Sequence, residues 1–211
     1  MASNLPAGDF SAWLGEIRRA VRGDDESAVP CGGCTACCRS SQFVHIAPDE
    51  ADTLAHIPPQ LLFPAPGLPA GHLLLGYDAR GHCPMLVDNA CSVYEHRPRT
   101  CRTYDCRVFP AAGVDVDDPD QAAVADQAGR WQFSYRTAMG RTEHDAVRAA
   151  ARFLADHPEL SGGGPMNATA TAVLAVQVHR TFLHQDEAGT KVVVADPGPD
   201  AVRAEMSGAP S

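Results

Sequence analysis

The chain has 211 residues, of which 45% are hydrophobic, and 26 acidic against 17 basic side chains give a formal net charge of −9. This size and composition predict a globular protein with one domain, or one domain with a helical extension. No apolar run reaches the roughly 18 residues of a membrane span, and an acidic chain without a basic stripe does not favour nucleic-acid binding. We therefore expect neither a membrane nor a nucleic acid as a partner, and the sequence leaves a protein partner open.

The N-terminal segment predicts an amphipathic helix over residues 9–22. Asp9 or Ser11 can cap its start, and Gly23 can end it. The apolar residues at helical spacing are Phe10, Trp13, Leu14, Ile17 and Val21. We expect this face to pack on the protein's own core. The first 30 residues contain no apolar run of the signal-peptide kind, which favours a cytoplasmic, reducing location.

All eight cysteines fall between residues 31 and 106. They are Cys31, Cys34, Cys37 and Cys38, spaced as C-x2-C-x2-C-C, followed by Cys83, Cys91, Cys101 and Cys106. In a reducing compartment, closely spaced cysteines are more often metal ligands or redox centres than disulfides. The adjacent pair Cys37 and Cys38 also fits poorly with separate unstrained disulfides. We therefore predict that all eight cysteines bind metal at one site.

Two kinds of metal centre are compatible with this spacing. An iron-sulfur cube takes C-x2-C-x2-C and a distant cysteine that is followed by proline, and Cys83 precedes Pro84 here. Zinc takes four thiolates, usually from two separate C-x2-C turns, and the chain has no second, separate turn of this kind. The pattern favours an iron-sulfur cluster of the 4Fe-4S type, and zinc stays open as the alternative.

Between the two cysteine groups the sequence predicts little regular structure. We expect a short strand over residues 42–46, a helix over residues 49–56 that prolines end, and an irregular apolar loop over residues 61–76 that covers the metal site. His82, next to Cys83, is a candidate ligand besides the cysteines.

A polar block follows at residues 91–102, which reads C-x2-Y-E-x-R-P-x2-C-R. Pro98 biases Arg97 toward an extended backbone, so the Arg97 guanidinium should point in a defined direction. We expect the side chains of Tyr94, Arg97 and Arg102 to surround the metal or to hold an anionic substrate. The alternative for Arg97 is an ion pair with Glu95 or Asp105.

Taken in order, these motifs resemble those of the bacterial CxxCxxCC or YkgJ-like family, whose members are described as zinc- or iron-chelating. The resemblance spans residues 29–110. It implies that the family's cysteine positions correspond to Cys31, Cys34, Cys37, Cys38, Cys83, Cys91 and Cys101, and its polar positions to Tyr94, Arg97, Pro98 and Arg102. The chain departs from the family at Tyr104, Asp105 and Cys106, where members often carry an aromatic residue and a proline.

The rest of the chain predicts helices. We expect a solvated acidic linker over 112–129, a strand over 131–135, buried helices over 142–157 (capped by Thr142) and 166–184, a strand over 191–195 and a loose tail over 197–211. The fold class is then mainly α with irregular loops and a little β, in which helices pack on a small metal-organised cysteine-rich core. The predicted domains are an N-terminal helix (1–28), a cysteine-cluster domain (29–110), a helical extension (111–190) and a strand with a flexible tail (191–211).

These observations predict a metal-binding cysteine-cluster protein that carries iron-sulfur and has a structural or electron-transfer role. The alternative is a zinc-binding protein, or a metalloenzyme that holds its substrate near Arg97 and Arg102. The motifs of nucleotide-binding enzymes and of G-x-S-x-G hydrolases do not occur. The sequence therefore names no reaction and no catalytic residue.

Overall fold

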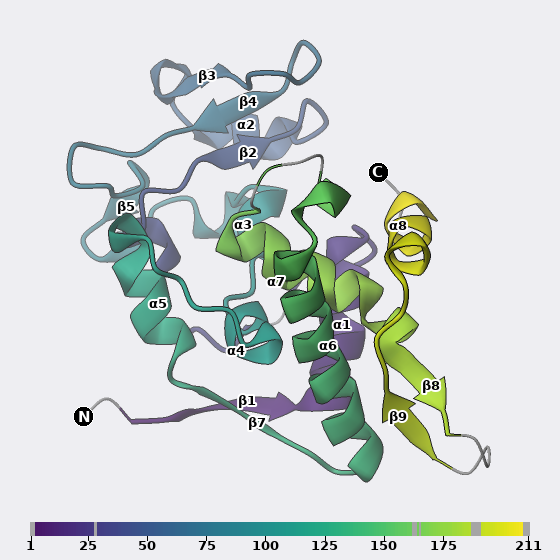
Figure 1. Ribbon diagram of the computed structural model, residues 1–211. Coiled ribbons are helices and arrows are strands. Elements are labelled where there is room, and N and C mark those ends of the chain that lie inside the picture. Colours follow the sequence, from purple (N-terminus) through teal and green to yellow (C-terminus); the bar gives the residue numbers. More distant parts are fainter. Residues whose placement is uncertain (1–2, 28, 162–163, 165, 187–190, 209–211) are drawn as a thin grey trace. The chain divides into compact units, whose positions relative to one another are not determined.

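A computed structural model describes residues 3–27, 29–161, 164, 166–186 and 191–208 (Figure 1). The chain divides into two compact units. The helical unit comprises Met1–Asp25, Cys106–Val116 and Ala128–Ser211, and the cysteine-rich unit comprises Glu26–Asp105 and Asp117–Gln127. Segments from both ends of the chain thus belong to the helical unit. The four-part division suggested by the sequence stays a prediction.

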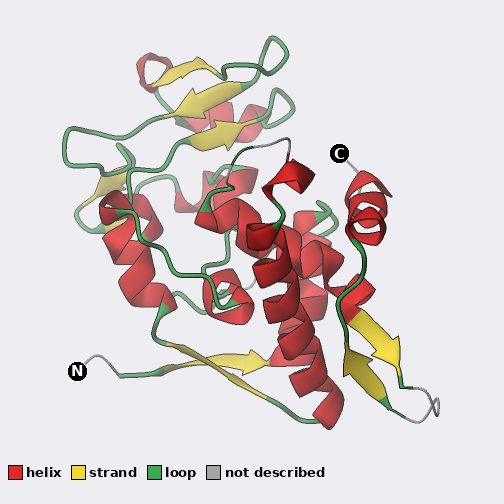
Figure 2. Ribbon diagram, viewed as in Figure 1, coloured by secondary structure: helices red, strands yellow, loops and turns green. Residues whose placement is uncertain are grey.

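Helices dominate the described residues, and the strands form only small sheets of two or three strands (Figure 2). Both units also contain long irregular connections between short elements. The predicted fold class, mainly α with irregular loops and a little β, is therefore confirmed.

The helical unit contains five α-helices in its described part: α1 (Phe10–Val21), α4 (Val108–Ala112), α6 (Ala138–Asp156), α7 (Ala168–Val178) and α8 (Pro199–Gly208). Two short 3-10 helices are η5 (Pro158–Ser161) and η6 (His179–Phe182). Strand β1 (Leu5–Asp9) pairs in parallel with β7 (Trp131–Ser134), and β8 (Leu183–Gln185) pairs antiparallel with β9 (Val192–Val194).

Helix α1 confirms the amphipathic helix predicted at the N-terminus. The Asp9 side chain caps it by accepting a hydrogen bond from the Ala12 amide (3.2 Å). Phe10 is fully buried, stacks on His144 of α6 at 4.2 Å between ring centroids, and meets Phe133 of β7 at 5.0 Å. The apolar face therefore packs inside the helical unit, as the sequence predicts.

Three predictions for the C-terminal half need correction. Helix α6 begins before Thr142, because Thr137 caps it by accepting a hydrogen bond from the Gly140 amide (3.2 Å). The helix predicted to run to residue 184 ends at Val178, and β8 follows after η6. The tail predicted to be loose forms α8, since Pro199 suits the first turn of a helix and Val202 is fully buried. Residues 209–211 of that predicted tail lie outside the described residues.

The cysteine-rich unit is built from shorter elements. A sheet with the order β2-β4-β3 contains β2 (Val44–Ile46), β4 (Leu73–Leu75) and β3 (Leu62–Pro64), and a hairpin contains β5 (Leu86–Val87) and β6 (Ala90–Cys91). The α-helices are α2 (Ala51–His56), α3 (Arg99–Thr103) and α5 (Ala122–Ala128), whose last residue is already in the helical unit. The 3-10 helices are η1 (Cys37–Arg39), η2 (Pro59–Leu61), η3 (Tyr94–His96) and η4 (Pro119–Gln121).

The strand β2 and the helix α2 confirm two predicted elements, but two neighbouring segments differ from the prediction. The segment 61–76 is not an irregular loop, because it supplies β3 and β4. Pro64 is tolerated there because β3 is an edge strand, where a missing N–H costs no ladder bond. The segment 112–129 is not only a linker, since Asp118 accepts a hydrogen bond from the Asp120 amide (3.0 Å) to start η4 and an alanine-rich stretch continues as α5.

The core of the cysteine-rich unit is small. Its main hydrophobic cluster contains five buried residues, Ile46, Ile57, Leu75, Met85 and Val93. Cys83 and Cys91 are among the partly buried residues that pack against this core. The core therefore reaches the place where the second group of cysteines begins.

Candidate metal centre

The run of four cysteines starts in a tight turn. The Cys34 amide donates a hydrogen bond to the Cys31 carbonyl oxygen (2.9 Å). Gly32 has a φ of 54°, a left-handed conformation that glycine adopts without steric cost. The Ala36 amide donates to Cys34 Sγ (3.5 Å), and hydrogen bonds to sulfur favour the thiolate that binds metal. The turn is therefore suited to presenting sulfur ligands.

A hairpin carries Cys91, one of the second group of cysteines. The Cys83 amide donates to the Cys38 carbonyl oxygen (2.8 Å), which ties the second group to the first. Cys91 ends β6, and the residues between β5 and β6 are Asp88 and Asn89, with φ of 49° and 61°. Two successive positive φ angles are the signature of the type I′ turn, which joins two strands tightly. The turn thus fixes the place of Cys91 relative to Cys83.

Polar side chains join this hairpin to the first cysteine run. Asn89 Oδ1 accepts a hydrogen bond from Arg39 Nη2 (2.6 Å) and one from Thr35 Oγ1 (3.4 Å). Arg39 Nε in turn donates to Thr35 Oγ1 (3.1 Å). The three side chains close a small network between residues that are about 50 positions apart in the sequence.

The helix that carries Cys101 is fastened at its start. The buried Glu50 carboxylate accepts hydrogen bonds from two backbone amides, one of them that of Arg99 (2.5 Å), the first residue of α3. Such an amide has no partner within its own helix. Thr100 Oγ1 donates to the carbonyl oxygen of His45 in β2 (2.8 Å). Two bonds therefore fix Cys101 against the sheet.

Electrostatic interactions link five cysteines, each with at least three of the others, and we call them the five-cysteine group: Cys37, Cys38, Cys83, Cys91 and Cys101. A hydrogen bond with Cys38 lowers the pKa of Cys37 to about 7, and the same bond raises the pKa of Cys38. Burial, and then the negative charges of Cys37, Cys83 and Cys91, raise the pKa of Cys101 to about 12. Each thiolate therefore disfavours ionisation of the neighbouring thiols unless a cation compensates the charge.

The other three predicted ligands lie outside the five-cysteine group. Cys31 is exposed and Cys34 is half-buried. Cys106 is buried in the helical unit, where its Sγ accepts a hydrogen bond from Trp131 Nε1 (3.2 Å). All eight cysteines lie among the described residues, and none forms a disulfide. The metal-binding role of the eight cysteines stays a prediction.

Arg97 packs on Tyr94 close to the five-cysteine group. Its Cζ lies 3.7 Å from the centroid of the Tyr94 ring, and its Nε donates to the Tyr94 carbonyl oxygen (2.7 Å). The backbone of Arg97 is extended, with φ −57° and ψ 142°, as Pro98 predicts. The guanidinium lies within electrostatic reach of Cys37 and Cys101. It is thus a cation held beside candidate thiolates.

Arg102 has a buried donor without a hydrogen-bond partner in the described part of the chain. Its Nε lies 3.3 Å from Glu26 Oε1, within the distance of an ion pair, but the contact does not have the geometry of a hydrogen bond. A buried N–H in this state costs about 1–3 kcal/mol. The Arg102 guanidinium is therefore held beside Glu26 by charge rather than by a hydrogen bond from Nε.

His82 lies in a loop that Asp78 orders. Asp78 Oδ1 accepts hydrogen bonds from the amides of His82 (2.9 Å) and Arg80 (2.8 Å). The His82 amide, and then the Arg80 side chain, lower the pKa of the Asp78 carboxyl to about 2. The loop thus fixes the backbone just before Cys83, and the role of His82 as a ligand stays a prediction.

Sequence reasoning missed the residues that hold the cysteines in place. The pair Asp88 and Asn89 carries a recognisable signal, because Asp and Asn tolerate the positive φ of a hairpin turn. Glu50 and Thr100 carry none, since each acts on a segment about 50 residues away. Such residues become visible only once the chain is folded.

Comparison with known proteins supports the cysteine pattern. Residues 30–123 match the model of the CxxCxxCC family, described as a "putative zinc- or iron-chelating domain". The comparison with curated proteins found no match, and neither did the comparison with solved structures. Among the described residues, no helix combines the length and apolar character that crossing a bilayer requires. The resemblance seen in the sequence is thus confirmed over residues 30–123, which match the model of the CxxCxxCC family.

Proposed function

We propose that the cysteine-rich unit binds an iron-sulfur cluster through the five-cysteine group, and that the cluster has a structural or electron-transfer role. The observation that carries this proposal is the convergence of three segments that are distant in the sequence. Cys37 and Cys38, Cys83 and Cys91, and Cys101 lie within electrostatic reach on backbone that hydrogen bonds hold in place. An apolar core of this size has little other reason to gather five thiols.

The spacing of the sulfurs favours a cluster over a single zinc ion. Among the described residues, no three cysteine sulfurs lie within 4.8 Å of one another. Thiolates bound to one zinc ion at about 2.3 Å would lie about 3.8 Å apart in a tetrahedron. In a 4Fe-4S cube each cysteine binds its own iron, so the ligands spread around a larger centre. A cluster therefore requires less contraction of the five-cysteine group than zinc does.

The surrounding residues suit a redox-active or structural cluster. When bound, such a cluster supplies one-electron transfer at a potential that hydrogen bonds to its sulfurs adjust. Cys37 is exposed, so a cluster held there lies within reach of an electron-transfer partner at the surface. The guanidinium of Arg97 balances negative charge beside Cys37 and Cys101. Residues of this chain thus supply ligands, charge balance and access.

A zinc-dependent or other metalloenzyme is the second candidate, and Arg102 favours it. Its guanidinium pairs with the exposed Glu26 carboxylate at 3.3 Å, and an anionic substrate would take the place of that carboxylate. Arg97 would supply a second cation near the metal. In this reading one metal coordination position stays open to substrate.

Purification of the full chain under nitrogen tests the proposal. We expect iron and acid-labile sulfide in similar amounts, with a visible absorption band. Cys101→Ser should lose most of the iron, because a serine oxygen replaces a thiolate ligand. Cys106→Ser tests the role of Cys106: iron loss would identify a ligand, and unchanged iron would identify a buried hydrogen-bond partner of Trp131. Zinc without sulfide would support the zinc alternative. Full iron occupancy in Cys101→Ser would contradict the assignment of the five-cysteine group.

A further inference from the structure

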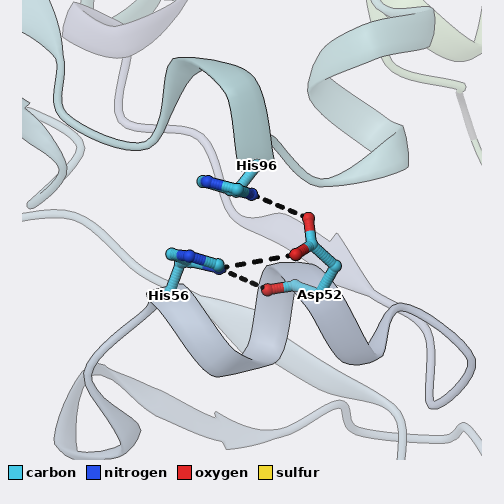
Figure 3. A group of neighbouring side chains, drawn as sticks. All are labelled: Asp52, His56 and His96. Carbon is cyan, nitrogen blue, oxygen red and sulfur yellow. Dashed lines mark hydrogen bonds and ion pairs between the residues drawn. The ribbon is translucent and has the colours of Figure 1, made fainter.

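A second group of metal-binding side chains lies outside the cysteines. Asp52 and His56 project from α2 and His96 ends η3, and Figure 3 shows both imidazoles turned toward the Asp52 carboxylate. His96 Nδ1 lies 2.8 Å from Asp52 Oδ2, and His56 Nδ1 lies 3.7 Å from Asp52 Oδ1. One ligand atom from each of the three residues lies within 4.8 Å of the others. We call these residues the histidine site.

The local fold brings the three residues together. Asp52 and His56 are four residues apart in a helix, so they lie on the same face. The buried Thr53 hydroxyl donates to the carbonyl oxygen of Arg97 (3.4 Å), the residue after η3, and this holds η3 against α2. The rings of His56 and His96 consequently stack in parallel, with 3.4 Å between the ring centroids and an angle of 3° between the ring planes.

This arrangement differs from an ordinary surface ion pair. A single exposed histidine-aspartate pair contributes only about 0–1 kcal/mol and does not need a second imidazole on the same carboxylate. Here two imidazoles and one carboxylate converge, which is the donor set that divalent transition metals take from proteins. The side chains are 70% (Asp52), 42% (His56) and 37% (His96) exposed, so water can fill the remaining coordination positions.

A bound ion requires the two imidazoles to rotate out of their parallel stack, because a ring nitrogen binds a metal ion in the plane of its ring. The ligand atoms also have to approach one another. Ligand atoms around a tetrahedral zinc ion with bonds of about 2.0–2.1 Å lie about 3.4 Å apart, so the atoms of the histidine site need to approach by an ångström or so from their present limit of 4.8 Å. His56 Nδ1 now lies 2.8 Å from the Asp52 carbonyl oxygen. If His56 binds the metal through Nδ1, the ring hydrogen lies on Nε2. The contact between Nδ1 and the Asp52 carbonyl oxygen is then replaced by the bond to the metal.

We propose that Asp52, His56 and His96 bind one divalent transition-metal ion, distinct from the metal of the five-cysteine group. Three protein ligands in an exposed position favour an ion that exchanges with solvent, with open coordination positions, over a closed structural site. His96 lies between Cys91 and Cys101 in the sequence, so a single segment contributes to both metal centres. This site contains no sulfur ligand and goes beyond the proposed function.

Titration of the full chain with Co²⁺ tests the histidine site. Protein purified under nitrogen, with the five-cysteine group already loaded, should bind one further equivalent of Co²⁺. The new absorption should lack the intense sulfur-to-cobalt charge-transfer band that thiolate ligands produce. His96→Gln should weaken Co²⁺ binding by at least about tenfold, because loss of a group that only orients a ligand already weakens metal binding about 10–100-fold. The iron content should stay unchanged.

Two further variants complete the test. His56→Gln removes a ligand on α2 and should have the same effect as His96→Gln, so a local disturbance of η3 cannot account for the result. His184→Gln is the matched control, because His184 is an exposed histidine whose ring contacts the Thr181 carbonyl oxygen at 2.9 Å in the helical unit. No additional Co²⁺ in the wild type, or equal binding by the wild type and both site variants, would refute the proposal. Loss of iron from the site variants would refute its independence from the cysteines.

Discussion

The two units of this protein are held together by different means. The helical unit buries large aromatic side chains, and Phe10, Trp13 and Phe182 are each at most 2% exposed. The cysteine-rich unit combines strands of two or three residues with a hydrophobic core cluster of five buried side chains. Burial alone can offset the conformational entropy of the first unit. For the second unit, we expect metal binding to supply part of the folding free energy.

The sequence provides a separate probe for each unit. Both tryptophans, Trp13 and Trp131, belong to the helical unit, so tryptophan fluorescence reports on that unit alone. Bound metal and its visible absorption report on the cysteine-rich unit. Each prediction below states which of these two signals should change.

Removal of the metal should have the largest effect. Apparent binding free energies of structural zinc ions are about 10–16 kcal/mol, and without a metal only hydrogen bonds, such as the one from the Cys83 amide to the Cys38 carbonyl oxygen, are left to close the loops of the five-cysteine group. We expect a strong chelator to unfold the cysteine-rich unit and leave the helical unit intact. Hydrogen exchange followed by mass spectrometry should show lost protection across residues 29–105, with unchanged protection in α6 and α7. Equal loss in both units would show that the units do not fold separately.

Truncation of Trp13 should have the second largest effect, in the opposite unit. Trp13 is 2% exposed and lies 5.4 Å from Phe10 and 4.8 Å from Phe133 between ring centroids. Removing a buried aromatic ring costs about 3–5 kcal/mol, because a cavity remains. Trp13→Ala should therefore lower the urea midpoint seen by Trp131 fluorescence, while the metal content stays at the wild-type value. Metal loss in this variant would contradict the separation of the two units.

Acid should weaken the helical unit through two buried histidines. Burial, and then the nearby Arg148, lower the pKa of His144 to about 4. Burial, the largest cause, lowers the pKa of His179 to about 4 as well. The unfolded chain binds these protons near pH 6.5, so unfolding takes up protons between pH 6.5 and 4. The free energy of unfolding should fall with decreasing pH in that window, by up to about 1.4 kcal/mol per pH unit for each histidine.

Urea unfolding followed by tryptophan fluorescence at pH 7, 6 and 5 measures this slope. His179→Leu removes one of the two groups and should reduce the slope by about half. His184→Gln, at an exposed position, should leave it unchanged. A flat profile between pH 7 and 5 in the wild type would contradict the assignment of the two histidines as neutral and buried.

The fold was predictable where one local pattern decides it, and α1 is the clearest case. Its apolar residues recur at helical spacing, and Asp9 gives the cap that the sequence predicts. Strand β1 could not be predicted, since it contains Pro6 and Gly8 and pairs with a segment more than 120 residues later. Helix α8 was missed because only Val202 of its residues is buried, so no apolar stripe marks it.

The candidate site was predictable in its residue types and not in its grouping. Cysteine spacing pointed to Cys37, Cys83 and Cys101, and the structure brings these within electrostatic reach. The boundary between the two units falls between Asp105 and Cys106, so Cys106 belongs to the helical unit. No signal in the sequence marks this boundary. The histidine site was missed for a similar reason, since His96 lies 44 residues from Asp52 and only tertiary packing joins them.

The smallest predicted effect concerns the turn that positions Cys91. Asp88 has a φ of 49°, and its neighbour Asn89 has one of 61°, so the turn needs residues that tolerate the left-handed region. Asp88→Val should destabilise the cysteine-rich unit by about 1–2 kcal/mol, because a β-branched side chain crowds the backbone there. Asp88→Gly should match the wild type or exceed it slightly, since glycine removes this strain.

Comparison of these two variants isolates the backbone conformation from the lost carboxylate, because both lack it. Stability of the cysteine-rich unit is measured by the chelator concentration that releases half of the bound metal, with tryptophan fluorescence as the internal control. Asp88→Val should release metal at a lower chelator concentration than Asp88→Gly, with identical fluorescence. Equal release from the two variants would mean that the hairpin does not set the position of Cys91, and that Cys83 and Cys91 are held by the metal itself.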